Sequence, residues 1–390
     1  MTNEQTNNDG WLSDLRVVDF SRLLPGPFCS VLLADMGADV IKVESPGGGD
    51  YARYYPPMVG EFGAFFAGIN RNKRSVTLDL KTDAGAEAAR KLIASADIVL
   101  ESFRPGVMER LGLDYEAMSA SHPELVYCSI SGYGQDGPMS DRAGHDLNYL
   151  ARAGLLEQNG DAGKKPVVPG FQLADIAGGA LYSALGIMSA IHKRDRGGEG
   201  AHVDISMTEG ALSFHLPMHS AMAAGQPQDR GQGMLTGGLP CYNIYETADG
   251  KYLSVAPLEP KFWMGFVQAI DAPELAGDGM SSGEDGERVK EKVAEIIATR
   301  TRDEWVEVFE EVDVCVEPIL EPDEALFDEL FKARQMFFKL QGIQHTRTPL
   351  TPKDRDHTGA PGLGQHTDDL LGELGYSDDE IAAMRDEDVL

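Results

Sequence analysis

Three residues of the chain are of types that can move a proton on and off carbon: one histidine and two carboxylates. His145 lies in the stretch Gly-His-Asp-Leu-Asn-Tyr, and its imidazole can give or take a proton near neutral pH. Asp175 follows in Leu-Ala-Asp, directly before a run of small residues. Glu259 stands in Leu-Glu-Pro, further along the chain.

Each of the three also has an ordinary structural interpretation. A single histidine is more often structural than catalytic, and Asp175 is placed where an aspartate caps the start of a helix. Glu259 by itself is a surface residue before a helix. The spacing along the chain does not show that the three side chains meet, so both interpretations stay open at this stage.

The residues around His145 and Asp175 favour a binding loop. A β-rich run at 125–130 leads into the glycine-rich segment Ser131–Pro138, a composition that is typical of a turn-built loop. Backbone N–H groups of this loop, and of the helix expected after Asp175, could stabilise a negative oxygen atom on a substrate.

The elements that would position these groups alternate between strand and helix. Runs typical of strands are followed by helical spacing at 28–36 and 84–96, which predicts a parallel, doubly wound α/β sheet. The turn after the first run lacks Gly-x-Gly-x-x-Gly, so the fingerprint of a nicotinamide or flavin dinucleotide site is missing. The expected strands are 15–20, 39–44, 76–80, 97–101, 125–130 and 201–206.

The charge balance is strongly acidic, with 34 basic against 63 acidic residues and a formal net charge of −29. This excludes binding to nucleic acid or to anionic membranes. Two basic clusters stand out against it near strand ends, where α/β proteins bind ligands and guanidinium groups suit phosphates. The alternative is solvated loop charge. The clusters are Asn72-Lys73-Arg74 and the pair Arg104 and Arg110.

The pattern changes after residue 225. The segment 208–224 is expected to be one long helix, and 225–238 is rich in Gly and Gln, which favours a linker. An Asp-Gly turn between the runs 242–247 and 251–255 predicts an antiparallel hairpin. We therefore expect a large domain at 1–225, a small α/β domain at 226–330 and a C-terminal segment at 331–390 that returns to the large domain.

Other features bear on where the protein works. Residues 1–10 are polar and lack the apolar core of a signal peptide, and no run of eighteen apolar residues occurs. The four cysteines are far apart and have no Cys-x-x-Cys spacing. We expect a reduced, cytoplasmic protein with no membrane span, no disulfide framework and no metal site.

The motifs taken together resemble those of the family III CoA-transferase superfamily, the CaiB/BaiF type. The resemblance covers the chain from about Leu15 to the C-terminus. Besides the stretches around His145 and Asp175, it rests on Arg-Val-Val-Asp-Phe, Gly-Ala-Asp-Val-Ile-Lys-Val-Glu, Phe-Arg-Pro-Gly and Gly-Leu-Gly-Gln-His-Thr. Within the superfamily the motifs come closest to those of α-methylacyl-CoA racemases.

The resemblance implies one of two reactions. In racemases of 2-methylacyl-CoA thioesters, the residues matching Asp175 and His145 serve opposite faces of the α-carbon, and a glutamate matching Glu259 supports the histidine. Racemisation through an enolate is therefore the first expectation. The alternative is a CoA-transferase that moves CoA between an acyl-CoA and a carboxylic acid, with Asp175 forming an acyl anhydride. A third interpretation is a non-catalytic acyl-CoA-binding protein.

The resemblance also implies a ligand and an assembly. Arg104 and Arg110 would hold CoA phosphates, Asn72, Lys73 and Arg74 would lie near the adenine, and Tyr149 would line the acyl pocket. No cofactor is expected beyond the CoA of the substrate. The fold implied is a large Rossmann-like domain with a small α/β domain in an interlocked homodimer. Phe171, Gln172 and Ser45 depart from residues that relatives often have.

Overall fold

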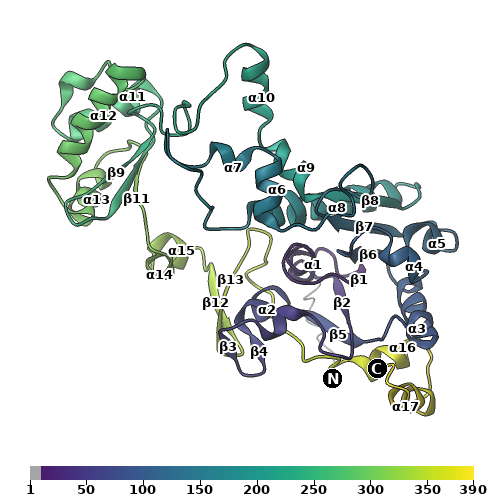
Figure 1. The fold of residues 1–390 in the computed structure, drawn as a ribbon. Coiled ribbons are helices and arrows are strands. Elements are labelled where there is room, and N and C mark those ends of the chain that lie inside the picture. Colours follow the sequence, from purple (N-terminus) through teal and green to yellow (C-terminus); the bar gives the residue numbers. More distant parts are fainter. Residues whose placement is uncertain (1–9) are drawn as a thin grey trace. The chain divides into compact units, whose positions relative to one another are not determined.

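The computed structural model describes residues 10–390, and its internal contacts divide the chain into two units (Figure 1). The first unit runs up to Ala153 and adds Gly170–Phe214 and Glu329–Leu390; the second comprises Gly154–Pro169 and His215–Asp328. The sequence-based boundaries at 225 and 330 differ in detail, because 154–169 and 215–225 also make their contacts in the second unit. The N-terminal residues considered for a signal peptide lie, up to residue 9, outside the described residues.

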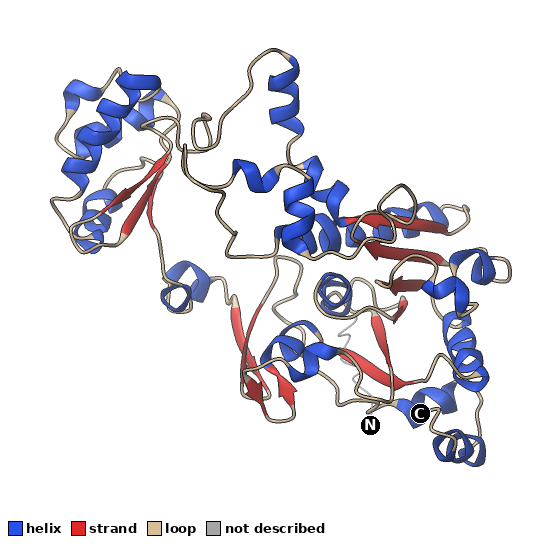
Figure 2. Ribbon diagram, viewed as in Figure 1, coloured by secondary structure: helices blue, strands red, loops and turns tan. Residues whose placement is uncertain are grey.

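The first unit is built on a six-stranded sheet in the order β5-β2-β1-β6-β7-β8 (Figure 2). Every neighbouring pair in it is parallel. This order is that of a doubly wound Rossmann-like sheet, which has its crevice where the order reverses, between β1 and β6. The strands are β1 (Arg16–Asp19), β2 (Asp39–Glu44), β5 (Lys73–Thr77), β6 (Ile98–Glu101), β7 (Val126–Ser131) and β8 (Ala201–Ser206).

Helices cover both faces of this sheet, which is why its central strands are apolar on both sides. Val18, Ile41 and Val99 point into a core that also holds helices α3, α16 and α17. On the opposite face, α1 packs on β1 and β2, and α8 packs on β7 and β8. These helices are α1 (Pro25–Asp35), α3 (Asp83–Ala94), α8 (Tyr182–Asp195), α16 (Thr367–Glu373) and α17 (Asp378–Asp386). The acidic C-terminal segment therefore folds onto the large unit.

Strand β5 begins three residues earlier than the sequence pattern indicates, at Lys73 rather than Val76. Lys73 is buried, and its ammonium lies 3.5 Å from Asp19 Oδ2 and donates to Asn70 Oδ1 at 2.8 Å. A charge without partners would be costly there, but this one is paired and hydrogen-bonded. The polar start of the strand is thus part of the interior.

Two further buried ion pairs lie beside this one and hold the loops that follow β1 and β2. Lys42 Nζ is 3.0 Å from Asp50 Oδ2, and the Asp50 carboxylate accepts the backbone N–H of Leu23 at 3.1 Å. Leu23 has a positive φ of 64°, an uncommon conformation for leucine that this bond helps to hold. Arg53 binds Glu44 through two bonds of 2.8 and 2.6 Å.

The expected long helix at 208–224 is two helices, α9 (Met207–Ser213) and α10 (Leu216–Ala223). Pro217 lies in the first turn of α10, and its ring has no N–H to continue a helix from the preceding turn. The break coincides with the boundary between the two units at Phe214 and His215.

One helical segment, η2 (Ala174–Leu181) continued by α8, is long and apolar enough to cross a membrane by length and composition alone. From the absence of an uninterrupted run of eighteen apolar residues, no such span is expected. Core helices of folded domains pass the same test, and this segment packs against α1, α9, β7 and β8. The η2 turns are π-helical, a widened form that is common at functional sites.

The second unit has its own core around an antiparallel sheet in the order β11-β10-β9. The hairpin predicted at the Asp-Gly turn is confirmed as β9 (Asn243–Glu246) and β10 (Tyr252–Val255), with β11 (Val316–Pro318) beside β10. The helices around it are α11 (Pro260–Ala269), α12 (Gly283–Ile297) and α13 (Arg302–Glu310).

Replacing Arg53 with Met tests the buried pair that holds the loop after β2. The change leaves the Glu44 carboxylate buried without its cation, so we expect a loss of about 3–5 kcal/mol in the free energy of unfolding, measured by urea denaturation. Arg288→Ala, at an exposed pair with Asp285, is the control and should cost much less. Equal losses would contradict this.

The same pair makes stability depend on pH. Burial raises the pKa of Glu44, but hydrogen bonds from Arg53 and Ser75 and the charge of Lys42 outweigh burial and leave it below its ordinary value of 4.5. The stabilisation is therefore present above pH 4.5 and lost as the pH falls through the lowered pKa. In Arg53→Met this acid-dependent part should shrink.

Candidate functional site

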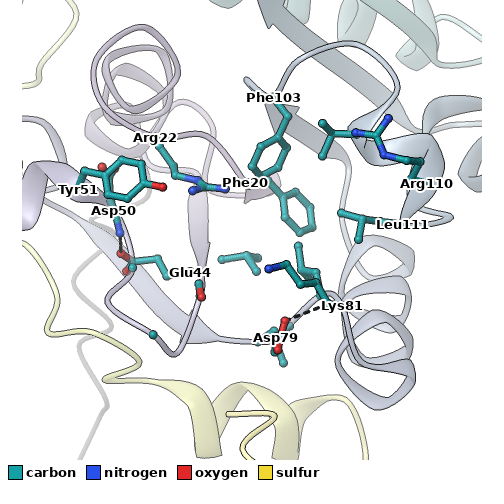
Figure 3. A pocket seen from close by; sticks show the side chains of 17 residues that line it. Phe20, Arg22, Glu44, Asp50, Tyr51, Asp79, Lys81, Phe103, Arg110 and Leu111 are labelled. Carbon is teal, nitrogen blue, oxygen red and sulfur yellow. Dashed lines mark hydrogen bonds between the residues drawn. The ribbon is translucent and has the colours of Figure 1, made fainter.

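A cavity of about 700 Å³ opens at the crevice where the strand order reverses, and we call it the strand-end pocket (Figure 3). Its wall includes the residues just after β1, β2 and β6, among them Phe20, Tyr51 and Phe103. Arg22, Lys81 and Arg110 supply positive charge there, beside the carboxylates of Glu44, Asp50 and Asp79. Aromatic faces and cations together suit a ligand that has a flat ring and phosphates.

Arg22 is the cation in the middle of this region, and Figure 3 shows it between Tyr51 and Phe103. Its guanidinium carbon lies 4.8 Å from the Phe103 ring centroid and 5.7 Å from that of Tyr51. In the described part of the chain it has no carboxylate partner. Stacked but unpaired, the guanidinium is free to bind an anion.

A second cavity of about 410 Å³, the His145–Asp175 pocket, adjoins the first. Arg22 and Phe103 line both cavities, so one wall is shared. His145, Asp175, Tyr149 and Arg104 all line the second cavity, and all belong to the first unit. The structure therefore brings four of the predicted site residues to one place.

His145 precedes the helix α6 (Asp146–Arg152), and its position depends on two glycines. Its backbone N–H donates to Asn148 Oδ1 at 3.1 Å, and the Tyr149 hydroxyl donates to the Gly144 carbonyl at 2.6 Å. A Cβ on Gly132 or on Gly144 would lie 2.6 Å from the Tyr149 ring. The Tyr149 ring can occupy this place, bonded to the Gly144 carbonyl next to His145, only because neither glycine has a side chain.

Asp175 lies in the first turn of η2, half-buried beside Asp146. The backbone N–H of Asp175 donates to Asp146 Oδ1 at 3.0 Å. Burial, and secondly the charge of Asp146, raise the pKa of Asp175 to about 7. A carboxylate whose pKa lies near the working pH is suited to take and return a proton.

The helix that carries Asp175 is held close to α9 by small residues. A Cβ on Gly210 would lie 2.1 Å from the Gly178 carbonyl oxygen, and one on Gly178 would lie 2.9 Å from the Met207 carbonyl oxygen. The two backbones touch there. The run of small residues after Asp175 thus fixes the position of its helix.

Several backbone donors expected to face a substrate are already used within the protein. The N–H of Gly134 donates to Ser131 Oγ, and that of Gln135 donates to Asp204 Oδ2. The N–H groups of Asp175 and Ile176 donate to Asp146 and to the Gln172 carbonyl. These four N–H groups are therefore not free to donate a hydrogen bond to a negative oxygen atom on a substrate.

The cluster Asn72-Lys73-Arg74 makes internal contacts instead of lining either pocket. Asn72 donates to Asp35 Oδ1 at 2.8 Å, and Lys73 is buried with Asp19. Arg74 binds Asp39 Oδ2 and Glu373 Oε1, both at 2.6 Å. The structure shows these three side chains bonded to carboxylates of the protein, and their place near an adenine stays a prediction.

The other predicted residues are distributed as follows. Arg110 lines the strand-end pocket, and Arg104 lines the His145–Asp175 pocket. Glu259 lies in the second unit as the residue preceding α11, and its support of His145 stays a prediction. Sequence reasoning assigned no role to Arg22, Lys81 or Asp146. The rule that ligands bind after the carboxyl ends of parallel strands could have pointed to Arg22, three residues past β1.

The chain is similar to known proteins over nearly its whole length. The chain matches CoA-transferase family III over residues 12–367. Human α-methylacyl-CoA racemase is 37% identical over 386 residues, with 97% of each chain covered. The succinyl-CoA–D-citramalate CoA-transferase of Chloroflexus aurantiacus is 34% identical, with 96% of each covered.

A crystal structure of a CaiB/BaiF family protein from Brucella suis superposes with a TM-score of 0.81 at 33% identity. The superposition covers 94% of this chain and 100% of that one. Sequence and fold agree over nearly the whole length. The chain belongs to CoA-transferase family III.

Proposed function

We propose that the protein racemises 2-methylacyl-CoA thioesters by removing and returning the α-proton through an enolate. The observation that carries the proposal is that His145 and Asp175 line one cavity, which shares a wall with a cation-bearing pocket. The 37% identity to α-methylacyl-CoA racemases, against 34% to a transferase, supports the same choice.

The reaction needs two groups that exchange protons with the same carbon from opposite faces. A thioester α-proton is weakly acidic, so the groups must be held in place and the enolate stabilised. Asp175 in its ionised form takes the proton on one face, and His145 in its protonated form gives one back on the other. Each turnover leaves the pair with one proton in all, ready for the reverse reaction.

Delivery of the substrate follows from the shared wall. In the proposal the nucleotide end of CoA lies in the strand-end pocket, its phosphates near Arg22 and Arg110, and the thioester reaches the second cavity past Phe103. Guanidinium groups bind phosphates in a bidentate manner. No metal or redox cofactor takes part in the proposed steps.

A transferase is the second candidate, because Asp175 could instead attack the thioester carbonyl and form an acyl anhydride. CoA leaves as the thiolate, and an acceptor carboxylate displaces the donor acid to form a new anhydride with Asp175. The thiolate then attacks the acceptor carbonyl of this anhydride, which gives the new thioester and frees the Asp175 carboxylate. The similarity of the chain to two CoA-transferases, at 34% and 32% identity, supports this second candidate. It has no need for the imidazole of His145.

Incubating one enantiomer of a 2-methylacyl-CoA in D₂O separates the two reactions. We expect deuterium at the α-carbon and loss of optical purity without any acceptor acid, followed by mass spectrometry and chiral chromatography. His145→Ala should lower racemisation by about 100-fold or more, since one of the two acid–base groups is gone. Asp175→Asn is the matched variant and should abolish both racemisation and transfer. Undiminished racemisation in His145→Ala, or transfer by the wild-type protein without exchange, would contradict the racemase proposal.

The pH profile tests the state of Asp175. The active pair holds one proton, so kcat/KM should fall on the acid side as Asp175 becomes protonated, with the midpoint near its pKa of about 7. Both enantiomers should show the same profile, because their equilibrium constant is one at every pH. Asp146→Asn removes part of the cause of the raised pKa and should move the acid limb to lower pH. If the acid limb does not move in Asp146→Asn, the titration that it reports belongs to a group other than Asp175.

We also propose that the protein works as a homodimer. Large apolar side chains are exposed on η2, α8 and α9, namely Leu181, Leu185, Leu212 and Phe214, and Leu185 is 63% exposed. These elements pack on one another in the first unit. Exposed apolar groups that gather on neighbouring elements favour an interface with another protein.

Leu185→Asp tests the dimer by placing a charge on this apolar surface. We expect the molar mass in solution, measured by light scattering, to fall from twice the 42.2 kDa of one chain towards that of the monomer. Leu350→Asp, at a 40% exposed leucine elsewhere in the first unit, is the control and should leave the mass unchanged. A wild-type monomer would overturn the proposal.

A further inference from the structure

A third cavity, of about 450 Å³, is lined in part by the loop that follows β6, and we call it the Glu101 pocket. It shares Arg104 and Pro105 with the His145–Asp175 pocket. Glu101, the last residue of β6, lines it and is only 4% exposed. The proposed reaction uses neither this carboxylate nor its neighbours.

Two polar residues of the neighbouring strands, His202 on β8 and Ser129 on β7, lie beside this carboxylate. His202 Nε2 lies 3.0 Å from Ser129 Oγ. Ser129 pairs with Glu101 in the register of β6 and β7, and hydrogen bonding from its side chain acts to lower the pKa of Glu101. A hydroxyl has one proton to donate, so when Glu101 is ionised Ser129 donates to it and accepts from His202 Nε2–H. The direction of both hydrogen bonds therefore depends on the charge of Glu101.

The imidazole of His202 is held by aromatic rings. Tyr115 stacks on His202 with centroids 5.1 Å apart, and Tyr127 meets it edge-on at 5.7 Å. Tyr127 is fixed in turn by donating to the Leu113 carbonyl at 2.9 Å. The ring is thus kept in a position where it can bond Ser129.

At the other end, Glu101 holds the loop that carries substrate contacts. The backbone N–H of Phe103 donates to Glu101 Oε2 at 2.7 Å. Phe103 lies on the wall shared by the two substrate cavities, and Arg104 lines the cavity of His145 and Asp175. Gly106, at a φ of 78°, ends this short loop before α4 (Val107–Arg110), which carries Arg110.

We infer that Glu101, supported by Ser129 and His202, is a positioning residue that sets the affinity for coenzyme A by fixing the loop of Phe103 and Arg104. The inference rests on the proposed binding of an acyl-CoA at these cavities. It concerns ligand affinity and not the proton transfer itself, because Glu101 touches none of the reacting groups.

The hold on the loop is strongest when Glu101 is ionised, since a charged acceptor forms the stronger hydrogen bond. Burial raises the pKa of Glu101 to about 7, helped by the charge of Asp204, while Ser129 and the Phe103 N–H oppose the rise. Affinity for CoA should therefore increase as the pH rises through 7. The charged or titratable groups that line the Glu101 pocket or interact electrostatically with the carboxylate are Arg104, Glu109, Asp114, Tyr115, Glu116, Tyr127, Cys128, His202 and Asp204.

The test measures binding of free coenzyme A by isothermal titration calorimetry at about pH 6 and about pH 8. Both proteins carry Asp175→Asn, so that Asp175 does not titrate, and one also carries Glu101→Gln, which keeps the size of the side chain. We expect Glu101→Gln to bind about 5-fold more weakly at the higher pH and to differ little at the lower one. The CoA phosphates titrate equally in both measurements and cancel in the comparison.

Two serine variants show whether Glu101, Ser129 and His202 act as a unit. Ser129→Ala removes the link to His202 but leaves Glu101, and should weaken CoA binding in the same direction. Ser121→Ala is the matched control, because Ser121 Oγ lies 2.9 Å from His122 Nδ1 in an exposed pair outside the three cavities. Thermal denaturation of each variant confirms that it is folded.

The outcomes separate the inference from the proposed function. If CoA binds and Glu101→Gln matches its parent in affinity at both pH values, the positioning role is wrong while the proposed function stands. Equal weakening by Ser121→Ala and Ser129→Ala would also overturn it, as a general effect of serine removal. If the wild-type protein binds no CoA, both proposals fail together.

Discussion

The loops that line the strand-end pocket depend on charges that have little access to water. Asp19, Lys42, Glu44 and Asp50 lie at or near the carboxyl ends of β1 and β2, Lys73 is the first residue of β5, and all five are buried. Each has an oppositely charged partner and further hydrogen bonds, without which burial would be prohibitive. Such a network gains its energy only in one arrangement, so it fixes the loops that line the strand-end pocket more sharply than apolar packing would.

Much of the fold followed from patterns that reflect burial on both faces. Apolar runs such as 39–44 and 125–130 predicted central parallel strands, and the Asp-Gly turn predicted the hairpin of the second unit. The start of β5 could not be predicted from the apolar pattern, because Lys73 and Ser75 are polar residues inside the protein. Their burial depends on partners far away in sequence, which no local pattern reveals. The division of 207–223 into two helices depended on a single proline.

The candidate site was predictable where a local motif carries it. The predicted residues His145, Asp175 and Arg104 line one cavity. Arg110 lines the cavity that adjoins it. The roles of Arg22 and Asp146 can be seen only in the tertiary structure. Arg22 stacks on Phe103, and Asp146 bonds the backbone of Asp175, and both contacts join segments that are distant in sequence. The reverse holds for Lys73 and Arg74, whose charges are paired with carboxylates of the protein, and for Asn72, which donates to Asp35. A cation is available to a ligand only when the fold has left it without a partner.

The unpaired guanidinium of Arg22 lies in a protein whose formal charge is −29, and this governs how a CoA ester would arrive. At long range a multiply charged anion is repelled, and attraction begins only within the reach of the cations at the strand ends. Dissolved salt screens the long-range repulsion over about 10 Å at 0.1 M, while close contacts in a cavity are screened less. Association would then become faster with rising ionic strength, the reverse of electrostatic steering between unlike charges. An anionic ligand of this kind would then bind faster in a concentrated electrolyte than in dilute buffer.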